Sequence, residues 1–386
     1  MRSLRLALLV LAQIVVALFI VEVLGQAYFN NPFSAPNRYL FTSLDSFRDV
    51  GPFWTYRQNI DAKEVAIYQT VFGGFEKEYE CDYHADKLGF VDNESSGNRD
   101  YDFLLLGDSF TQGQGGCPWA GTLRQHLPGA SIYNAGLQGT GPANWAPIAQ
   151  YLVQQGLRFR AAIVIFISDD FQRHLTNYDE KQLGCLHDLT LCDGDFFYPI
   201  VSGLDLMKAS AERAQGTLGF TQRATYTQSA IYFCERYLWV SCFIAEGVKH
   251  LIQPPQLPIP ISEDARRGLD SLLTTFPRLL LIRVRTKDEV ALQSDNVSTI
   301  AVKRFLRDRK IDWADCTISY DGFLARDPHP NSNGYRQLAQ CITQILRDPQ
   351  KASIWGRDTE LHHPPHPRAD RPKVRSSQAH EQPIPE

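Results

Sequence analysis

The chain has 386 residues, of which 39 are Lys or Arg and 43 are Asp or Glu, so its formal net charge is −4. This length fits one large domain with additions, or two modest domains. The nearly even charge, without a basic stripe interleaved with aromatic residues, argues against a nucleic-acid partner.

The N-terminal residues 1–27 differ from the rest of the chain. Two arginines precede an apolar run from Leu6 to Leu24 that only Gln13 and Glu22 interrupt. A helix of about 20 apolar residues can cross a bilayer, and positive charge before it favours an N-terminus that stays in the cytoplasm. We therefore predict an uncleaved, single-pass membrane anchor, with the remaining chain exported. A signal peptide cleaved near residues 25–27 is the alternative.

Residues 28–100 predict short strands joined by turns. The segments GPFWTYRQN (51–59) and ADKLGFVDNE (85–94) contain Gly, Asn and Asp residues, which favour turns. We expect this region to be an N-terminal extension that packs on the main domain.

The main domain is expected over residues 101–348, where strand and helix patterns alternate. Strands are predicted at 101–108, 130–136, 160–170 and 278–285, and helices at 118–127, 141–155, 262–276 and 332–346. The segment RAAIVIFISDD is apolar throughout its centre, as a strand buried on both faces should be. This alternation predicts a parallel sheet with helices on both faces. We predict a cysteine-rich insertion or lid at about 171–260, where the pattern breaks.

Eight cysteines in a chain predicted to be exported indicate disulfide bonds, because oxidising compartments favour them. No C-x-x-C pair is present, which argues against a zinc ribbon or a thioredoxin-type site. We predict the two short-range pairs Cys185–Cys192 and Cys234–Cys242 and leave the pairing of the other four open. Those four are Cys81, Cys117, Cys316 and Cys341.

The C-terminal residues 349–386 are predicted to be a disordered tail. From about Asp358 the sequence is rich in Pro and charged residues and has almost no large apolar residue. Such a segment cannot bury enough surface to offset its chain entropy. We interpret its histidines, His362, His363 and His366, as solvated side chains rather than metal ligands.

Polar clusters stand at the carboxyl ends of three of the predicted strands. They are Gly107–Asp108–Ser109, Asn134–Ala135–Gly136 and Ser168–Asp169–Asp170. In open parallel sheets, ligands bind beyond the carboxyl ends of the strands, so these clusters are expected to meet at one edge. The serine that follows a buried strand is a candidate nucleophile, and a serine nucleophile needs a base with an orienting acceptor.

Among the histidines outside the tail, His329 has the surroundings of a general base. It lies in the turn-rich segment DPHPNSNGY just before the last predicted helix, and Asp327 precedes it by two residues. An acid at this position is near enough to accept a hydrogen bond from the imidazole ring. His174, close after the third predicted strand, is the rival base.

The motifs GDSFTQG, NAGLQGTG, FISDDF and DPHPNSNGY, in this order, resemble those of the SGNH/GDSL hydrolase superfamily, in particular its bacterial membrane-anchored members. The resemblance covers about residues 80–348 and implies a flavodoxin-like, three-layer α/β/α sandwich with a parallel sheet. It implies that Ser109 is the nucleophile, His329 the base and Asp327 the orienting acid. The backbone N–H groups of Ser109 and Gly136 would face the oxyanion.

Two positions depart from the superfamily pattern. The acid usually stands three residues before the histidine, where this chain has Arg326, so Asp321 is a fallback for Asp327. The third motif usually supplies an Asn side chain as an oxyanion donor, and Asp169 replaces it here. An ionised carboxylate cannot donate a hydrogen bond.

Three explanations are open for Asp169. Burial beside Asp170 can raise its pKa and keep it protonated, or the site can be weakened or non-hydrolytic. We favour the remaining explanation, in which Asp169 points away and another side chain donates to the oxyanion. The candidate donors are Asn134, Gln138 and Asn144.

The sequence therefore predicts an exported serine esterase that hydrolyses acetyl or related esters, for example on cell-envelope glycans. Its catalytic domain would lie in the periplasm or outside the cell, anchored in a bacterial inner membrane. A periplasmic O-acyltransferase acting on a polysaccharide is the first alternative, and a binding or scaffold protein with a weakened site is the second. We expect no cofactor and no metal, because GxGxxG, Walker and HExxH motifs are all missing.

Overall fold

The computed structural model describes most of the chain up to residue 348, with gaps. The described residues are 2–28, 38–43, 45–69, 75–93, 99–175, 198–199, 238, 240–242, 244–245, 248 and 260–348. Most of the predicted insertion over 171–260 and all of the predicted tail over 349–386 lie outside them, so both stay predictions.

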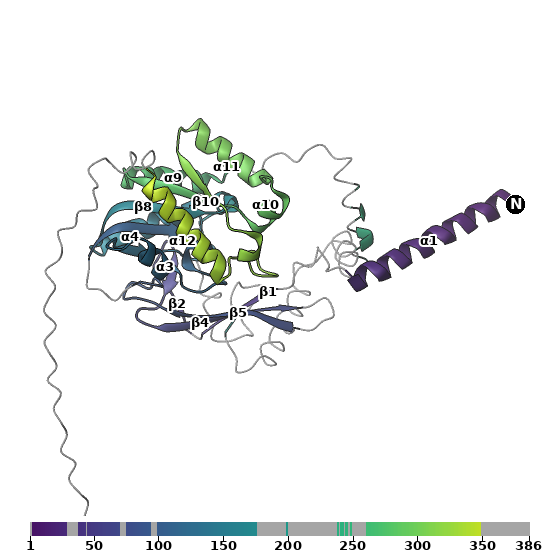
Figure 1. Ribbon diagram of the computed structural model, residues 1–386, viewed down its shortest axis with the longest axis horizontal. Coiled ribbons are helices and arrows are strands. Elements are labelled where there is room, and N and C mark those ends of the chain that lie inside the picture. Colours follow the sequence, from purple (N-terminus) through teal and green to yellow (C-terminus); the bar gives the residue numbers. More distant parts are fainter. Residues whose placement is uncertain are drawn as a thin grey trace, which may run out of the picture.

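The core of the protein is a five-stranded parallel sheet (Figure 1). Its strands are β6 (Asp100–Gly107), β7 (Ile132–Asn134), β8 (Arg158–Phe166), β10 (Leu279–Val284) and β11 (Trp313–Cys316). They lie in the order β11-β10-β8-β6-β7, and all neighbours are parallel. From β7 onward, with strands counted along the chain, this order is 2-1-3-4-5, as in flavodoxin-like folds. The predicted α/β class with a parallel sheet is confirmed.

Helices cover both faces of this sheet. The helices on one face are α3 (Ala120–His126) and α12 (Ser332–Arg347). Those on the other face are α4 (Pro142–Gln154), α9 (Glu263–Thr275) and α11 (Val297–Asp308). Three short helices follow β6, β8 and β11, namely α2 (Ser109–Gln112), η1 (Ser168–Gln172) and η3 (Tyr320–Gly322), and α10 (Lys287–Leu292) follows β10.

The strands divide their side chains between two apolar cores, because successive residues of a strand point to opposite faces. In β6, Leu105 packs among side chains of α3 and α12, whereas Leu104 and Leu106 pack among those of α4 and α9. All three leucines are fully buried. A strand buried on both sides has no polar face, so its sequence is continuously apolar.

Three strands from the residues before β6 and one later strand form a second, mostly antiparallel sheet beside the parallel one (Figure 1). Its strands are β5 (Phe75–His84), β4 (Asp61–Gln69), β1 (Arg38–Thr42) and β9 (Tyr198–Pro199), in this order. A separate hairpin consists of β2 (Phe47–Asp49) and β3 (Trp54–Tyr56). The Phe47 ring lies 4.6 Å from that of Trp54 and 4.8 Å from that of Tyr56, so aromatic contacts stabilise the hairpin.

The N-terminal helix α1 (Arg2–Tyr28) extends away from the body of the protein (Figure 1). Its Glu22, a polar residue inside the apolar run, is buried. The Glu22 carboxylate accepts hydrogen bonds from the backbone N–H groups of Val240 and Ser241 at 3.0 and 2.8 Å. Within the described part of the chain, no helix combines the length and the apolar character that membrane crossing requires. The transmembrane segment predicted over residues 1–27 is therefore not confirmed.

Where both cysteines are among the described residues, two disulfide bonds connect elements that are distant in the sequence. Cys81 on β5 bonds to Cys117 before α3, and Cys316 on β11 bonds to Cys341 on α12. The pairing of these four cysteines could not be predicted from the sequence, because the partners are 36 and 25 residues apart and only the fold brings them together. The first bond fastens the antiparallel sheet to the segment after α2.

Both disulfides predicted over short sequence distances fall in the insertion. Cys185, Cys192 and Cys234 lie outside the described residues. Cys242 is disulfide-bonded, and none of the described cysteines is free. The pairs Cys185–Cys192 and Cys234–Cys242 therefore stay predictions.

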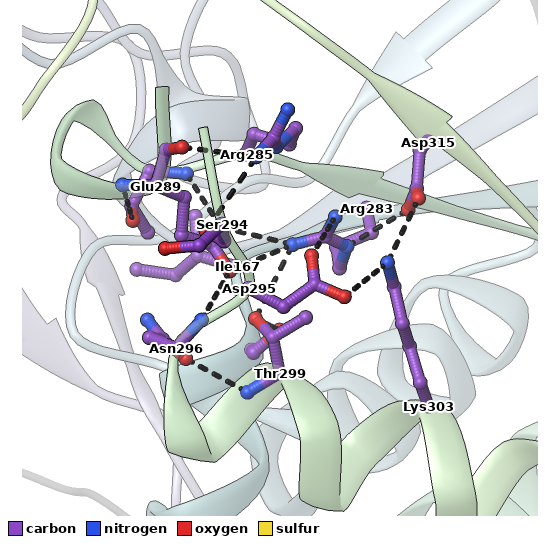
Figure 2. A network of polar contacts seen from close by, with 12 residues as sticks. Ile167, Arg283, Arg285, Glu289, Ser294, Asp295, Asn296, Thr299, Lys303 and Asp315 are labelled. Atoms are coloured by element: carbon purple, nitrogen blue, oxygen red, sulfur yellow. Dashed lines mark hydrogen bonds and ion pairs between the residues drawn. The ribbon is translucent and has the colours of Figure 1, made fainter. Parts of the chain in front are cut away.

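A buried arginine near the carboxyl end of β10 joins several elements (Figure 2). The Arg283 side chain is 1% exposed, and its Nη1 contacts the Glu289 carboxylate at 2.9 Å. Its Nε donates to Asp315 Oδ1 at 2.8 Å, and Nη1 donates to Thr299 Oγ1 at 3.2 Å. The Thr299 hydroxyl donates to Ser168 Oγ at 2.6 Å, so the network reaches the start of η1.

We expect Arg283→Met to lower the free energy of unfolding by about 3–5 kcal/mol, because it leaves the buried Glu289 without its countercharge. Arg309→Met is the matched control, since Arg309 pairs with Asp270 at the surface, where the two side chains are 35% and 50% exposed. Such surface pairs are worth at most about 1 kcal/mol. Urea unfolding followed by circular dichroism measures both variants. Equal losses would contradict a special role for the Arg283 network.

Candidate active site

The turn after β6 places Ser109 at the start of α2. The strand ends at Gly107, and Asp108 caps the helix, because its Oδ1 accepts the Phe110 N–H at 2.9 Å. A Cβ at position 107 would lie 1.9 Å from Thr111 Oγ1. Gly107 is therefore required by the close approach of the helix to the strand, and Ser109 follows the tightest part of the turn.

His329 lies beside Ser109, although they are 220 positions apart in the sequence. The Ser109 Oγ and His329 Nε2 atoms are 2.7 Å apart. The loop holds its shape because the Leu324 N–H donates to the His329 carbonyl oxygen at 3.0 Å and Phe323 forms a β-bridge with Pro330. Ser109 and His329 are 6% and 7% exposed, so their contact is largely shielded from water.

The third member of this series of contacts is Asp327. Its Oδ1 contacts His329 Nδ1 and also accepts the His329 backbone N–H at 2.8 Å. The Asp327 carboxylate is fully buried. One carboxylate oxygen thus fixes both the backbone and the ring of the histidine, so the Asp-Pro-His spacing suffices for alignment. With Nδ1 facing the acid, Nε2 is left to face Ser109, as a general base requires.

The loop that carries Asp327 is fastened from two sides. Lys287 Nζ, at the start of α10, donates to the Leu324 carbonyl oxygen at 2.6 Å. From the opposite sheet, Glu78 Oε1 on β5 accepts the Arg326 N–H at 2.9 Å. Sequence reasoning missed Lys287 and Glu78, because both contacts join segments that are far apart in the chain. The antiparallel sheet therefore helps to position the proposed acid.

The alternative base, His174, and the alternative acid, Asp321, are both exposed. His174 is 77% exposed at its side chain and pairs with Asp264 of α9 at 3.0 Å. Asp321 is exposed in η3. Of the proposed nucleophile, bases and acids, Ser109, His329 and Asp327 are the ones that meet at the carboxyl edge of the sheet.

Some of the groups expected to face the oxyanion already form hydrogen bonds within the protein. Gly136 packs against α2, since a Cβ on it would lie 2.4 Å from the Gln112 backbone nitrogen. The Gly136 N–H donates to Asn134 Oδ1 at 2.9 Å, and Asn134 Nδ2 donates to the Thr111 carbonyl oxygen at 3.1 Å. Asp169 is exposed in η1. The Gly136 N–H and the Asn134 amide are thus committed to each other and to the α2 turn.

The remaining donor candidates are buried. Gln138 Oε1 accepts from Gln114 Nε2 at 2.9 Å, and the Gln138 N–H donates to Gln112 Oε1 at 2.9 Å. Gln114 Nε2 also donates to Glu64 Oε1 of β4 at 3.0 Å. Asn144 is fully buried in α4. These glutamines connect the α2 turn to the antiparallel sheet.

One charged residue that the sequence did not single out belongs to the same cluster. Arg173, two residues after the FISDDF motif, contacts Asp170 Oδ1 at 2.7 Å and Asp108 Oδ2 at 3.2 Å. Burial raises the pKa of the Asp170 carboxyl well above its ordinary value; Arg173 opposes this rise, and Asp108 adds to it. Burial acts to lower the pKa of Arg173, but the two carboxylates outweigh it and the pKa is raised.

The site consists of a hydroxyl, an imidazole and a carboxylate that contact one another in this order. In the ranges that the structure describes, no group of three or more His, Cys, Asp or Glu side chains is placed to hold a metal ion. A serine, a histidine and an acid in this order of contacts form the arrangement of serine hydrolases, which recurs on unrelated folds.

No protein-family model matches the sequence, and no curated protein matches it. The solved structures that are similar to the chain include three esterases. One is described as an arylesterase from Agrobacterium tumefaciens str. C58, with 12% identity over 64% of this chain and 99% of that one and a TM-score of 0.32. Another is a carbohydrate esterase whose active site displays divergent catalytic and non-catalytic binding functions, with 12% identity, 83% and 99% coverage and a TM-score of 0.31.

The third is a family two carbohydrate esterase from Cellvibrio japonicus, with 11% identity over 82% of this chain and 98% of that one and a TM-score of 0.29. All three neighbours are esterases. With identities of 11–12% and TM-scores of 0.29–0.32, these likenesses are too distant to assign a function to this chain.

Proposed function

We propose that this protein is a serine esterase of the SGNH/GDSL type, with Ser109 as nucleophile, His329 as general base and Asp327 as the orienting acid. The observation that carries the proposal is the series of contacts from Ser109 Oγ to His329 Nε2, at 2.7 Å, and from His329 Nδ1 to the buried Asp327 carboxylate. A nucleophile, a base within hydrogen-bond reach and a group that orients the base are what activates a serine.

The reaction follows from these positions. His329 Nε2 takes the Ser109 proton as Oγ attacks the ester carbonyl carbon, and Asp327 stabilises the imidazolium that forms. The tetrahedral intermediate then collapses, the proton on Nε2 passes to the leaving alkoxide, and the alcohol departs from an acyl-Ser109. A water molecule next gives a proton to His329 and attacks the acyl carbon. The carboxylic acid is released as the proton returns to Ser109 Oγ.

We propose further that the substrate is an acetyl or similar ester on a bacterial cell-envelope glycan. The catalytic domain would act in the periplasm or outside the cell, held at the inner membrane by residues 1–27. The two described disulfides support an oxidising compartment. Apolar side chains along α1 are exposed, with Leu9 at 62% and Phe19 at 67%. Contiguous exposed apolar surface is typical of sites that contact membranes or other proteins.

A fluorophosphonate probe, which reacts with activated serines, tests the proposed nucleophile. The expected result is an adduct on Ser109 of the full chain, located by mass spectrometry, together with hydrolysis of p-nitrophenyl acetate. His329→Ala should abolish both, whereas the control His174→Ala, which changes an exposed histidine, should retain both. A folded wild-type chain with neither adduct nor hydrolysis would point instead to a binding or scaffold protein.

The acyl acceptor requires a separate measurement. The chain is incubated with p-nitrophenyl acetate, first in buffer and then with a soluble polysaccharide. Free acetate in equal yield in both reactions is expected of an esterase. Acetyl groups transferred to sugar hydroxyls at the expense of free acetate would identify an O-acyltransferase instead.

The Asp169→Asn variant is expected to keep the wild-type kcat for p-nitrophenyl acetate or to raise it by up to about 10-fold. The substitution removes a negative charge from the third motif and supplies an amide N–H that can donate to an oxyanion. Steady-state kinetics measure the effect, with Asp288→Asn, an exposed residue of α10, as the matched control. A sharp loss of kcat in Asp169→Asn alone would mean that the carboxyl has another role.

A further inference from the structure

Arg173 connects the loops that follow three neighbouring strands. Its Nη1 donates to the carbonyl oxygen of Thr140, in the loop after β7, at 2.6 Å. The same nitrogen contacts Asp108 Oδ2, after β6, at 3.2 Å, and Asp170 Oδ1, after β8, at 2.7 Å. β6 lies between β7 and β8 in the sheet. One guanidinium therefore holds together the three segments that form the edge around Ser109.

This cluster lies directly against the proposed nucleophile. Asp108 Oδ2, the oxygen that Arg173 contacts, is 3.4 Å from Ser109 Oγ. The Asp108 and Asp170 side chains are completely buried, whereas that of Arg173 is 28% exposed. Of these three ionisable side chains, Arg173 is thus the one that reaches the solvent side of the cluster.

The charge balance of the cluster depends on Arg173. Burial, with the help of the charge on Asp108, raises the pKa of Asp170 well above its ordinary value and favours its neutral form. Arg173 contacts both carboxyl groups, so its positive charge offsets negative charge on Asp108 beside Ser109. Without Arg173, a buried carboxylate would remain 3.4 Å from the Ser109 oxygen. Such a charge would oppose the negative charge that develops when this oxygen attacks a carbonyl group.

Two of the groups expected at the oxyanion cannot act as free donors in this structure. The Gly136 N–H is engaged by Asn134 Oδ1 at 2.9 Å, and Asp169 carries a carboxylate where a donor is expected. Transition states of acyl transfer require fixed donors or positive charge near the developing oxyanion. An arginine side chain carries five N–H donors and stays protonated.

We propose that Arg173 is a positioning residue for the esterase reaction, which neutralises Asp108 beside Ser109 and so allows the oxyanion to form without an amide from the third motif. This inference rests on the proposed function. It assigns to Arg173 an effect on kcat rather than on KM, because the charge on the substrate oxygen develops only in the transition state.

Kinetics of two Arg173 variants of the full chain, with p-nitrophenyl acetate, test the proposal. Arg173→Gln is expected to lower kcat by about 100-fold, the typical effect of removing one oxyanion-stabilising group, with KM changed by less than about 3-fold. Arg173→Lys keeps the positive charge and is expected to lose less than about 10-fold in kcat. A kcat for Arg173→Gln within about 3-fold of wild type would overturn the proposal.

The Asp108→Asn substitution distinguishes an electrostatic role of Arg173 from a merely structural one. In the Arg173→Gln background it removes the uncompensated charge, while its side-chain oxygen can still accept the Phe110 N–H. We expect kcat to recover by at least about 10-fold in this double variant, because the two residues are coupled. If Arg173 only held the loops together, Asp108→Asn would restore nothing, and this result would also overturn the proposal.

Thermal unfolding verifies the fold of every variant. If Arg173→Gln alone does not fold, the same comparison is made in an Asp170→Asn background, which removes the second acid that faces the guanidinium. Failure of the proposed function has a different signature from failure of this inference. In the first case the wild-type chain shows neither labelling of Ser109 nor ester hydrolysis. In the second the wild-type chain shows both, and the Arg173 variants equal it.

Discussion

The Ser109→Ala variant is expected to lose ester hydrolysis almost completely, with kcat for p-nitrophenyl acetate reduced by about 10⁴-fold or more. Without Oγ there is no atom for the acyl group to bond to, and only substrate binding and the surrounding polar groups remain. The fold should persist, because this hydroxyl contacts the side chains of His329 and Asp108 and the substitution removes no backbone hydrogen bond. Loss of one such hydrogen bond costs about 1 kcal/mol.

A matched serine variant controls for the assay and for the fold. Ser271→Ala on α9 removes a hydroxyl that accepts from Gln150 Nε2 at 3.1 Å at the surface. It should show wild-type kcat and wild-type thermal unfolding. If Ser109→Ala also kept its activity, the turn after β6 would be only a helix cap and the nucleophile would have to be sought elsewhere.

The parallel sheet could be predicted because strands buried on both faces have a distinctive sequence. The strand expected at 101–108 is observed as β6 at Asp100–Gly107, and the one expected at 278–285 as β10 at Leu279–Val284. β11 was missed. It has four residues and lies at the end of the order β11-β10-β8-β6-β7 of the described strands, and its apolar pattern is too short to recognise.

Topology predicted that the polar clusters after β6, β7 and β8 share one edge of the sheet. The proximity of Ser109 and His329 was implied by the resemblance of the GDSFTQG and DPHPNSNGY motifs, because no strand was predicted directly before the His329 segment. One local hydrogen bond could also have been predicted from the sequence. Asn134 Oδ1 accepts the N–H of Gly136, two residues ahead, at 2.9 Å. This is the Asx-turn contact that asparagine commonly makes, and it engages the N–H group that was expected to face the oxyanion.

Other parts of the site depend on contacts that no local pattern encodes. Arg173 reaches the Thr140 carbonyl oxygen because the loops after β7 and β8 lie side by side, and Lys287 reaches Leu324 across 37 positions of sequence. Charged residues in loops are common, so their type and position do not reveal which carbonyl or carboxylate they meet. The disulfide between Cys81 and Cys117 likewise joins a strand of the antiparallel sheet to the loop before α3, a contact that no local pattern predicts.

The Asp327→Asn variant is expected to lower kcat for p-nitrophenyl acetate by about 10⁴-fold, with the fold preserved. The amide oxygen can still accept the His329 backbone N–H that Asp327 Oδ1 accepts now at 2.8 Å. The amide is neutral, however, so it cannot stabilise the imidazolium, and its NH₂ group favours the tautomer whose Nε2 carries the proton. Such a ring cannot take the proton of Ser109.

Asp321→Asn is the matched control for this variant, because it makes the same change at the exposed acid of η3 and should leave kcat unaltered. Steady-state kinetics and probe labelling of Ser109 are measured on both variants. The comparison also decides whether an acid two residues before the histidine is sufficient. Loss of activity in Asp321→Asn, with Asp327→Asn active, would mean that the buried carboxylate supports the loop and that the exposed one orients the base.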